Sequence, residues 1–335
     1  MKVLIRPRPE LLDIFSKESV KNGIRQLMDP NIDLIFYDEI KNGEREIVIK
    51  EADILIGPKI DDNELNLYSN LKMHQTFATG LEGYNFAFYK NNHTILCNSH
   101  THSKLIAEYG FALLLSIAKE LIQNDQLLRE GNWDYTQYPA ITLFEKTILF
   151  LGYGNIAKIL KQMCIPFNMN CIAVKRTKGC DDPDIKIFTP EEKLEAIKQA
   201  DIVINTLPLT KKTINFIDKV EFEAMKPTVI IINVGRGVTI NEKELYTALK
   251  DKRIRGAAID VWYNYPKSRS PEKQEPLPCY PSKFPFYELK NVIMTAHRAW
   301  QSDILMRNFK PFIDNINKFI RGENPLNIVN LDEEY

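Results

Sequence analysis

The chain has 335 residues, of which 44% are hydrophobic and 26% are charged, a composition typical of soluble globular proteins. This length exceeds one ordinary hydrophobic core and suits two domains. The 44 Lys and Arg residues balance the 44 Asp and Glu residues, so the chain has no general attraction to nucleic acid or to an anionic membrane. We expect neither as a partner.

The sequence also bears on the cellular compartment. The apolar run at the N-terminus is too short for a signal peptide, and the longest apolar run, residues 111–118, is far too short to span a bilayer. The five cysteines are scattered and form no CxxC pair. Such a set is typical of reduced thiols, so we expect a cytoplasmic protein.

The N-terminal part of the chain alternates short apolar runs with helical patterns. Residues 2–5, 33–37 and 52–56 are bounded by charges or turn residues and predict strands. Residues 9–28 carry apolar side chains at helical spacing. Strands that alternate with helices indicate a parallel sheet covered on both faces.

A long helical pattern over residues 103–129, ended by Gly131, leads to a second and more regular α/β series. Its predicted strands are the runs 147–151, 171–174, 202–206, 229–234, 256–260 and 292–295. Residues 266–287 carry six prolines and predict a loop, and a last helical pattern over 304–321 should be kinked or broken near Pro311. The sequence therefore predicts an α/β fold with two doubly wound parallel sheets.

A glycine motif of the form GxGxxA directly follows the first strand of the second series and begins a helical pattern. The first glycine permits a tight turn, the second allows close approach to a pyrophosphate, and the small sixth residue lets helix pack on strand. The start of the helix offers N–H groups to phosphates. The predicted dinucleotide contacts are Gly152, Tyr153, Gly154, Asn155 and Ile156.

The residues after the next strand predict which dinucleotide binds. A site for NAD would show Asp or Glu about 20 residues after the glycine motif, to hold the ribose 2′-hydroxyl. Here Lys175, Arg176 and Thr177 stand in that place. Cations and a hydroxyl favour a 2′-phosphate, so we expect NADP, with NAD as the alternative if these are ordinary solvated loop charges.

Three later strands each deliver a polar residue at the carboxyl end, where a doubly wound sheet binds its ligands. These residues are Arg236, Asp260 and His297. Arginine presents a planar fork to a carboxylate and polarises a neighbouring carbonyl. Histidine titrates near neutrality and can exchange a proton with the carbonyl oxygen. The combination predicts reduction of a carbonyl beside a carboxylate.

The motifs GYGNIA, LPLTKKT, NVGRG and GAAIDVW resemble those of the D-isomer-specific 2-hydroxyacid dehydrogenases. The resemblance implies two Rossmann-like domains with the active site in the cleft between them. Residues 1–103 and 300–335 would form the substrate domain, and 104–299 the dinucleotide-binding domain. Residues 104–140 would be the arm through which members form homodimers.

The resemblance also implies a role for each matching residue. Arg236 would bind the substrate, His297 would be the acid and base, and Asp260 would hold the nicotinamide carboxamide. The backbone at Thr79 and Gly80 would grip the substrate carboxylate. Further cofactor contacts would lie at Leu207, Pro208, Thr213, Val234, Gly235 and Ala299.

The chain departs from the family pattern around the histidine. Family members usually carry a glutamate that hydrogen-bonds this histidine, and here either Tyr265 or Glu275 could stand in its place. Arg298 and Trp300 replace the usual neighbours of the histidine. His100 and His102 have HxH spacing, but without a matching cluster of ligands we expect no metal.

The resulting hypothesis is an oxidoreductase that interconverts a small 2-keto acid, such as glyoxylate or hydroxypyruvate, and its D-2-hydroxy acid. One alternative is a dehydrogenase of another small anion, such as formate or phosphite. The other is a scaffold that senses NADP(H) with little turnover.

Overall fold

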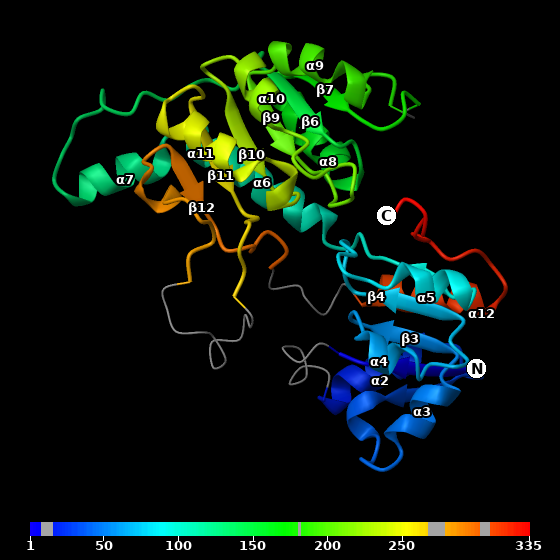
Figure 1. Ribbon diagram of the computed structural model, residues 1–335. Helices are drawn as coiled ribbons and strands as arrows, with labels where there is room; N and C mark the ends of the chain where they lie inside the picture. The colour runs from blue at the N-terminus through cyan, green and yellow to red at the C-terminus, as the bar shows by residue number, and fades with distance from the viewer. Residues whose placement is uncertain (8–15, 180–181, 267–278, 302–308) are drawn as a thin grey trace. The chain divides into compact units, whose positions relative to one another are not determined.

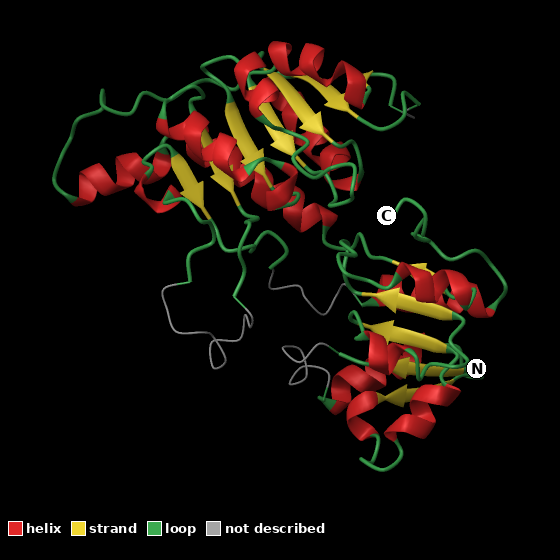
Figure 2. Cartoon of the chain, viewed as in Figure 1, coloured by secondary structure: helices red, strands yellow, loops and turns green. Residues whose placement is uncertain are grey.

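The computed structural model describes residues 1–7, 16–179, 182–266, 279–301 and 309–335 (Figure 1). The chain divides into two compact units, Met1–His102 with Asp303–Tyr335, and Ser103–Ser302. In each unit helices cover both faces of a parallel sheet (Figure 2). Within the described ranges, no helix combines the length and the apolar character needed to cross a bilayer.

The first unit is built on a five-stranded sheet in the order β2-β1-β3-β4-β5. Its strands are β1 (Lys2–Ile5), β2 (Asp33–Phe36), β3 (Ile54–Gly57), β4 (Met73–Thr76) and β5 (Ile95–Cys97). Its helices are α2 (Glu18–Leu27), α3 (Arg45–Glu51), α4 (Asp62–Leu65), α5 (Phe86–Asn91) and α12 (Lys310–Ile320). Because strand side chains alternate, Val3 and Ile5 pack toward α2 and α12, while Leu4 packs toward α3, α4 and α5.

The second unit is built on a seven-stranded parallel sheet in the order β12-β11-β10-β9-β6-β7-β8. Its strands are β6 (Thr147–Leu151), β7 (Asn170–Val174), β8 (Lys186–Phe188), β9 (Ile202–Asn205), β10 (Ile230–Asn233), β11 (Gly256–Ile259) and β12 (Val292–Met294). Its helices are α6 (Ser103–Ala118), α7 (Leu121–Arg129), α8 (Asn155–Cys164), α9 (Lys193–Gln199), α10 (Lys219–Ala224) and α11 (Glu242–Lys250). Short 3-10 turns of the chain lie at Tyr37–Glu39, Ile165–Phe167, Pro190–Glu192, Gly237–Thr239 and Phe286–Glu288.

The strand order of the second unit places a ligand site at β6. The chain winds outward from β6 in both directions, to β7 on one side and to β9 on the other. Such a reversal leaves a crevice beyond the carboxyl ends of the central strands. Two cores support the sheet, with α6 and α8 on one face and α9, α10 and α11 on the other.

The structure corrects the sequence prediction in two respects. The predicted helix over 103–129 is two helices, because Glu120 adopts a left-handed conformation (φ +52°) between α6 and α7. Its carboxylate accepts from Arg255 at 3.0 Å, a contact from the residue just before β11 that local spacing does not reveal. The prediction also missed β4, β5 and β8. Pro311 lies in the first turn of α12, where proline is tolerated.

A fully buried histidine explains why β4 escaped detection and makes the first unit sensitive to acid. His74 lies in β4, where its Nε2 bonds the carbonyl of Gly57 (3.3 Å) and its Nδ1 accepts from the Tyr89 hydroxyl (2.8 Å). Burial lowers the pKa of His74 from 6.5 to about 4. Between pH 6.5 and pH 4, His74 is protonated in the unfolded chain but neutral in the folded chain. The free energy of unfolding therefore falls as the pH drops toward 4.

His74→Gln should remove this part of the acid sensitivity, because glutamine keeps polar partners without titrating. Between pH 7 and pH 5 we expect the opening free energy of β4 to fall by about 2 kcal/mol less in the variant than in the parent chain. Hydrogen exchange of the β4 amides measures this. Equal losses in both proteins would contradict the assignment.

Candidate active site

The glycine loop after β6 has the geometry that a dinucleotide needs. Gly152 has φ +85°, and a Cβ there would also meet the Thr206 hydroxyl at 3.2 Å. Gly154 caps the start of α8, and a Cβ there would meet nothing within 4 Å. The second glycine thus keeps open a space in front of the first N–H groups of α8. A pyrophosphate fits such a space.

The side chain between these glycines points away from that space. Tyr153 is buried, and its hydroxyl donates to Asp182 Oδ2 at 2.5 Å. Lys161 of α8 donates to the other oxygen of the same carboxylate, also at 2.5 Å. Tyr153 therefore anchors the loop to the segment between β7 and β8, and only its backbone faces the phosphate position.

The segment after β7 is cationic. Lys175 lies directly beyond the strand, and its ammonium group donates to the Gly179 carbonyl at 2.7 Å. Arg176 and Thr177 are exposed. Lys178 is paired with Glu192 at 2.7 Å, which reduces its contribution. Residues 175–179 carry no carboxylate that would repel a 2′-phosphate.

The three predicted chemical residues follow neighbouring strands on one edge of the sheet. Arg236 follows β10, Asp260 follows β11 and His297 follows β12. The strands pair in parallel register, with Asn233 opposite Ile259 and Ile259 opposite Met294. The structure thus gathers these residues at the carboxyl edge that also carries the glycine loop.

Asp260 organises the segment that carries the histidine. Its Oδ1 accepts from the Thr295 hydroxyl (2.7 Å) and from the Arg298 N–H (2.8 Å), and its Oδ2 accepts from the Ala299 N–H (3.0 Å). Its own carbonyl accepts from the His297 N–H at 2.8 Å. His297 has φ +53°, a conformation that costs about 1–3 kcal/mol for a residue other than glycine. The buried carboxylate offsets that cost, a role that the sequence prediction did not include.

The imidazole of His297 contacts a tyrosine. Its Nδ1 lies 3.2 Å from the Tyr265 hydroxyl oxygen, which also accepts from the Trp262 N–H at 2.9 Å. Glu275, the other predicted partner, lies outside the described residues. This contact sets the side of the imidazole that carries Nδ1 against Tyr265.

A buried amide network that the sequence prediction missed holds the backbone of Arg236. Asn205 donates to the side-chain oxygen of Asn233 (2.8 Å) and to the Thr239 hydroxyl (2.7 Å). Thr239 in turn donates to the Arg236 carbonyl at 2.7 Å. The sequence signal was an asparagine at the end of two apolar strands, which lie opposite each other in the sheet.

The other predicted cofactor contacts lie along the same edge. Gly235 is pressed against the loop after β9, since a Cβ there would lie 2.8 Å from the Leu207 carbonyl oxygen. Thr213 closes that loop by donating to the Pro208 carbonyl at 2.7 Å. Val234 and Ala299 are buried.

Thr79 and Gly80 belong to the other unit, just beyond β4. The Thr79 hydroxyl donates to the Ser99 carbonyl at 2.6 Å, and the Asn98 side chain donates to the Thr79 carbonyl at 3.0 Å. These bonds fix the loop at the carboxyl edge of the five-stranded sheet. Among the residues that the structure describes, no group of three or more His, Cys, Asp or Glu side chains is placed to hold a metal ion.

A parallel sheet with a glycine loop after its central strand is the arrangement of a dinucleotide-binding domain. The model of the NAD-binding domain of D-isomer specific 2-hydroxyacid dehydrogenases matches residues 111–299. The chain therefore belongs to the D-isomer-specific 2-hydroxyacid dehydrogenase family.

Curated relatives resemble part of the chain. It is 30% identical over 231 residues to a glyoxylate reductase of Korarchaeum cryptofilum, which covers 67% of this chain and 65% of the relative. It is 29% identical over 289 residues to a D-3-phosphoglycerate dehydrogenase of Methanocaldococcus jannaschii, covering 82% of this chain and 50% of the relative. The chain thus spans from half to about two thirds of the length of these relatives.

A solved structure shows that the fold is shared along the whole chain. The D-isomer specific 2-hydroxyacid dehydrogenase from Xanthobacter autotrophicus Py2, in complex with NADPH and MES, superposes with a TM-score of 0.79. The match has 20% sequence identity and covers 100% of this chain and 99% of the other.

Gly154→Ala should separate dinucleotide binding from folding. No neighbour lies within 4 Å of the added methyl group, so the thermal unfolding midpoint should stay unchanged. The methyl group would occupy the space for the pyrophosphate, and we expect the affinity for NADPH to fall about tenfold or more. Fluorescence titration with NADPH measures this.

Gly235→Ala is the matched comparison, because its methyl group would lie 2.8 Å from the Leu207 carbonyl oxygen and should lower the unfolding midpoint. Unchanged NADPH affinity in Gly154→Ala would show that the glycine loop does not hold the pyrophosphate.

Proposed function

We propose that the protein uses NADPH to reduce a small 2-keto acid, such as glyoxylate or hydroxypyruvate, to the D-2-hydroxy acid. The observation that carries this proposal is the placement of Arg236 and His297 on the carboxyl edge of the sheet that bears the glycine loop. The similarity to glyoxylate reductases supports the same substrate class.

NADPH, when bound, supplies the hydride that reaches the keto carbon. The guanidinium of Arg236 would pair with the carboxylate of the substrate and draw electron density from the adjacent carbonyl. Its Nη1 donates to the carbonyl of the preceding Gly235 at 2.8 Å, which steadies the side chain. The pairing of the guanidinium with the carboxylate would orient the keto group of the substrate toward the cofactor. Thr79 and Gly80 would add backbone N–H donors to the same carboxylate.

His297 would deliver the proton to the carbonyl oxygen as the hydride arrives. In the imidazolium form, Nδ1–H would donate to the Tyr265 oxygen, and Nε2–H would be the donor to the carbonyl oxygen of the substrate. After transfer, Nε2 is the free base that accepts the proton back in the oxidative direction. Asp260 holds the backbone on both sides of the imidazole. Its proposed contact with the nicotinamide carboxamide would add to this role.

The preference for NADPH rests on the cations after β7. Lys175 and Arg176 directly follow β7, where the adenosine ribose of the dinucleotide would lie. The guanidinium of an arginine can form two parallel hydrogen bonds with a 2′-phosphate. The residues from 175 to 179 include no acid to hold a 2′-hydroxyl. NAD is the alternative cofactor.

We also propose a homodimer formed through the arm, in the cytoplasm. The arm exposes apolar side chains that a partner would cover: Trp133 is 80% exposed and Tyr135 is 90% exposed, after the exposed Leu121 and Leu128 of α7. The scattered free thiols among the described residues support a reducing compartment.

Substrate turnover with substitutions at the two central residues tests the reaction. NADPH consumption with a panel of 2-keto acids should exceed that with NADH. His297→Gln should lower kcat by about 100-fold or more while NADPH affinity is kept. Arg236→Gln should raise KM as well as lower kcat. Arg321→Gln is the control, since it removes an exposed arginine paired with Glu323 in the other unit.

The proposal is wrong if no 2-keto acid supports NADPH consumption, or if Arg236→Gln behaves like the control. Oxidation of formate or phosphite in the same panel would favour the small-anion dehydrogenase. Tight NADPH binding without any turnover would favour a sensing scaffold.

The partner of the histidine can be identified by paired substitutions. Tyr265→Phe should lower kcat about tenfold or more, because it removes the oxygen that orients the imidazole, whereas Glu275→Gln should leave kcat near that of the parent chain. Tyr265→Glu should shift the fall of kcat/KM for reduction to higher pH, because a carboxylate beside the imidazole favours its protonated form. A pH profile of kcat/KM measures both effects. A large loss in Glu275→Gln with little in Tyr265→Phe would make Glu275 the partner.

A further inference from the structure

The loop after β4 carries two peptide groups that are oriented by the segment after β5. The Thr79 carbonyl accepts from the Asn98 side chain at 3.0 Å, and the Ala78 carbonyl accepts from the Ser99 N–H at 2.9 Å. In a trans peptide group the carbonyl and the following N–H point in opposite directions. The N–H groups of Thr79 and Gly80 belong to these two peptide groups. Both therefore point to the side of the loop away from Asn98 and Ser99.

These two N–H groups are available to a ligand. Among the residues that the structure describes, none accepts a hydrogen bond from the N–H of Thr79 or of Gly80. Both residues are only half-buried. Successive backbone N–H groups with a common orientation attract an anion. The orientation of the two peptide groups is therefore what makes this loop suitable for a carboxylate.

The backbone of Asn98 is held on both sides. Its N–H donates to the Asn327 carbonyl at 3.1 Å, and its carbonyl accepts from the Gln75 side chain at 3.1 Å. Asn98 is 4% exposed, so its side chain is packed inside the unit. These contacts keep the Asn98 amide on the Thr79 carbonyl.

The same network continues into the C-terminal part of the chain. The Gln75 side chain accepts from the Asn315 amide of α12 at 2.7 Å, and that amide also donates to the Leu326 carbonyl at 3.0 Å. Two residues further on, Ile328 forms an antiparallel bridge with Cys97 at the end of β5. The C-terminal segment thus holds Asn98 in place, and Asn98 in turn holds the loop after β4.

We propose that Asn98 is a positioning residue for the carboxylate of the substrate. It acts through the Thr79–Gly80 peptide group, and the inference rests on the proposed function, in which Thr79 and Gly80 bind that carboxylate. Without the Asn98 amide, the Thr79 carbonyl loses its partner and the Gly80 N–H loses its direction. The loss falls on substrate affinity. The affinity for NADPH should stay unchanged, because the glycine loop belongs to the other unit.

Two substitutions of Asn98 test this role. Asn98→Ala removes the amide, and Asn98→Asp keeps its shape but, when ionised, cannot donate to a carbonyl. In both variants we expect KM for glyoxylate to rise about tenfold or more, with kcat near that of the parent chain. Oxamate carries a carboxylate beside a carbonyl and is not reduced. Its dissociation constant from the NADPH complex, measured by calorimetry, should rise by the same factor.

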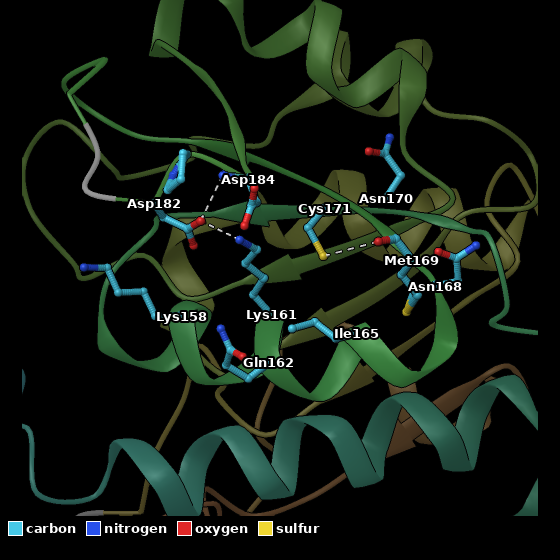
Figure 3. Close-up of a pocket in the computed structure, with 11 residues that line it drawn as sticks. Lys158, Lys161, Gln162, Ile165, Asn168, Met169, Asn170, Cys171, Asp182 and Asp184 are labelled. Atoms are coloured by element: carbon cyan, nitrogen blue, oxygen red, sulfur yellow. Dashed lines mark hydrogen bonds and ion pairs between the residues drawn. The ribbon is translucent and has the colours of Figure 1, made fainter.

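Two other asparagines provide matched controls. Asn92→Ala removes an amide that donates to the Phe88 carbonyl at 2.9 Å, at the end of α5 in the same unit. Asn170→Ala removes an amide that donates to the Thr147 hydroxyl at 3.3 Å in the other unit. Asn170 lines the hollow beside α8 that Figure 3 draws. Both control variants should keep the oxamate affinity and the KM of the parent chain.

A measurement on the parent chain keeps the test independent of the folding of any variant. When oxamate is added to the NADPH complex, the amide NMR signals of Thr79 and Gly80 should shift, because their N–H groups gain an acceptor. In Asn98→Asp these shifts should be smaller at the same oxamate concentration.

Three results would overturn the inference. The first is parent-like oxamate affinity in a folded Asn98 variant. The second is a loss of NADPH affinity as large as the loss of oxamate affinity, which indicates general damage. The third is the absence of shifts at Thr79 and Gly80 in the parent chain. If the parent chain reduces 2-keto acids and the Asn98 variants keep its KM, the proposed function stands and this inference alone fails.

Discussion

The arrangement of the site depends on one buried carboxylate. The oxygens of Asp260 accept from a hydroxyl and two backbone N–H groups of the segment 295–299, and its carbonyl accepts from His297 itself. Hydrogen bonds to a charged group contribute about 1.5–3 kcal/mol each, enough together to outweigh the left-handed backbone at His297. The imidazole thus starts from a rigid position, and Tyr265 has only to set the rotation of its ring. The orientation of the proposed acid and base comes from backbone bonds to Asp260 on the neighbouring strand.

Buried hydrogen bonds also position the backbone of Arg236, here through asparagine side chains. Asn205 and Asn233 end two paired strands, and with Thr239 they form a chain of hydrogen bonds that ends on the carbonyl of Arg236. The same amides reach the loop after β9, because Asn205 Oδ1 accepts from the Leu207 N–H at 3.2 Å. The proposed cofactor loop and the proposed substrate arginine therefore share one buried network. Such networks are specific when they are fully satisfied.

The sequence predicted both α/β units and the positions along the chain of the strands that lead to Arg236, Asp260 and His297, because buried parallel strands are continuous apolar runs. The sequence did not predict β4 because its His74 and Gln75 are polar. They are buried through hydrogen bonds, so the strand lacks the apolar run that marks its neighbours. β8 was too short to recognise. The break at Glu120 depends on Arg255, a residue far along the chain. For the site, the strand-end residues were visible, whereas the positioning roles of Asp260, Asn205 and Asn233 arise only from three-dimensional contacts.

The helix α6 carries a constraint that concerns the evolution of the chain. It packs against β10, β11 and β12, the strands that lead to Arg236, Asp260 and His297. At Gly110 the helix comes so near that a methyl group would already touch Val234 at 3.5 Å. Anything bulkier would press on the strand end two residues before the arginine. This single position is therefore limited to the smallest amino acids, and the helix and the strand end before Arg236 can change only together.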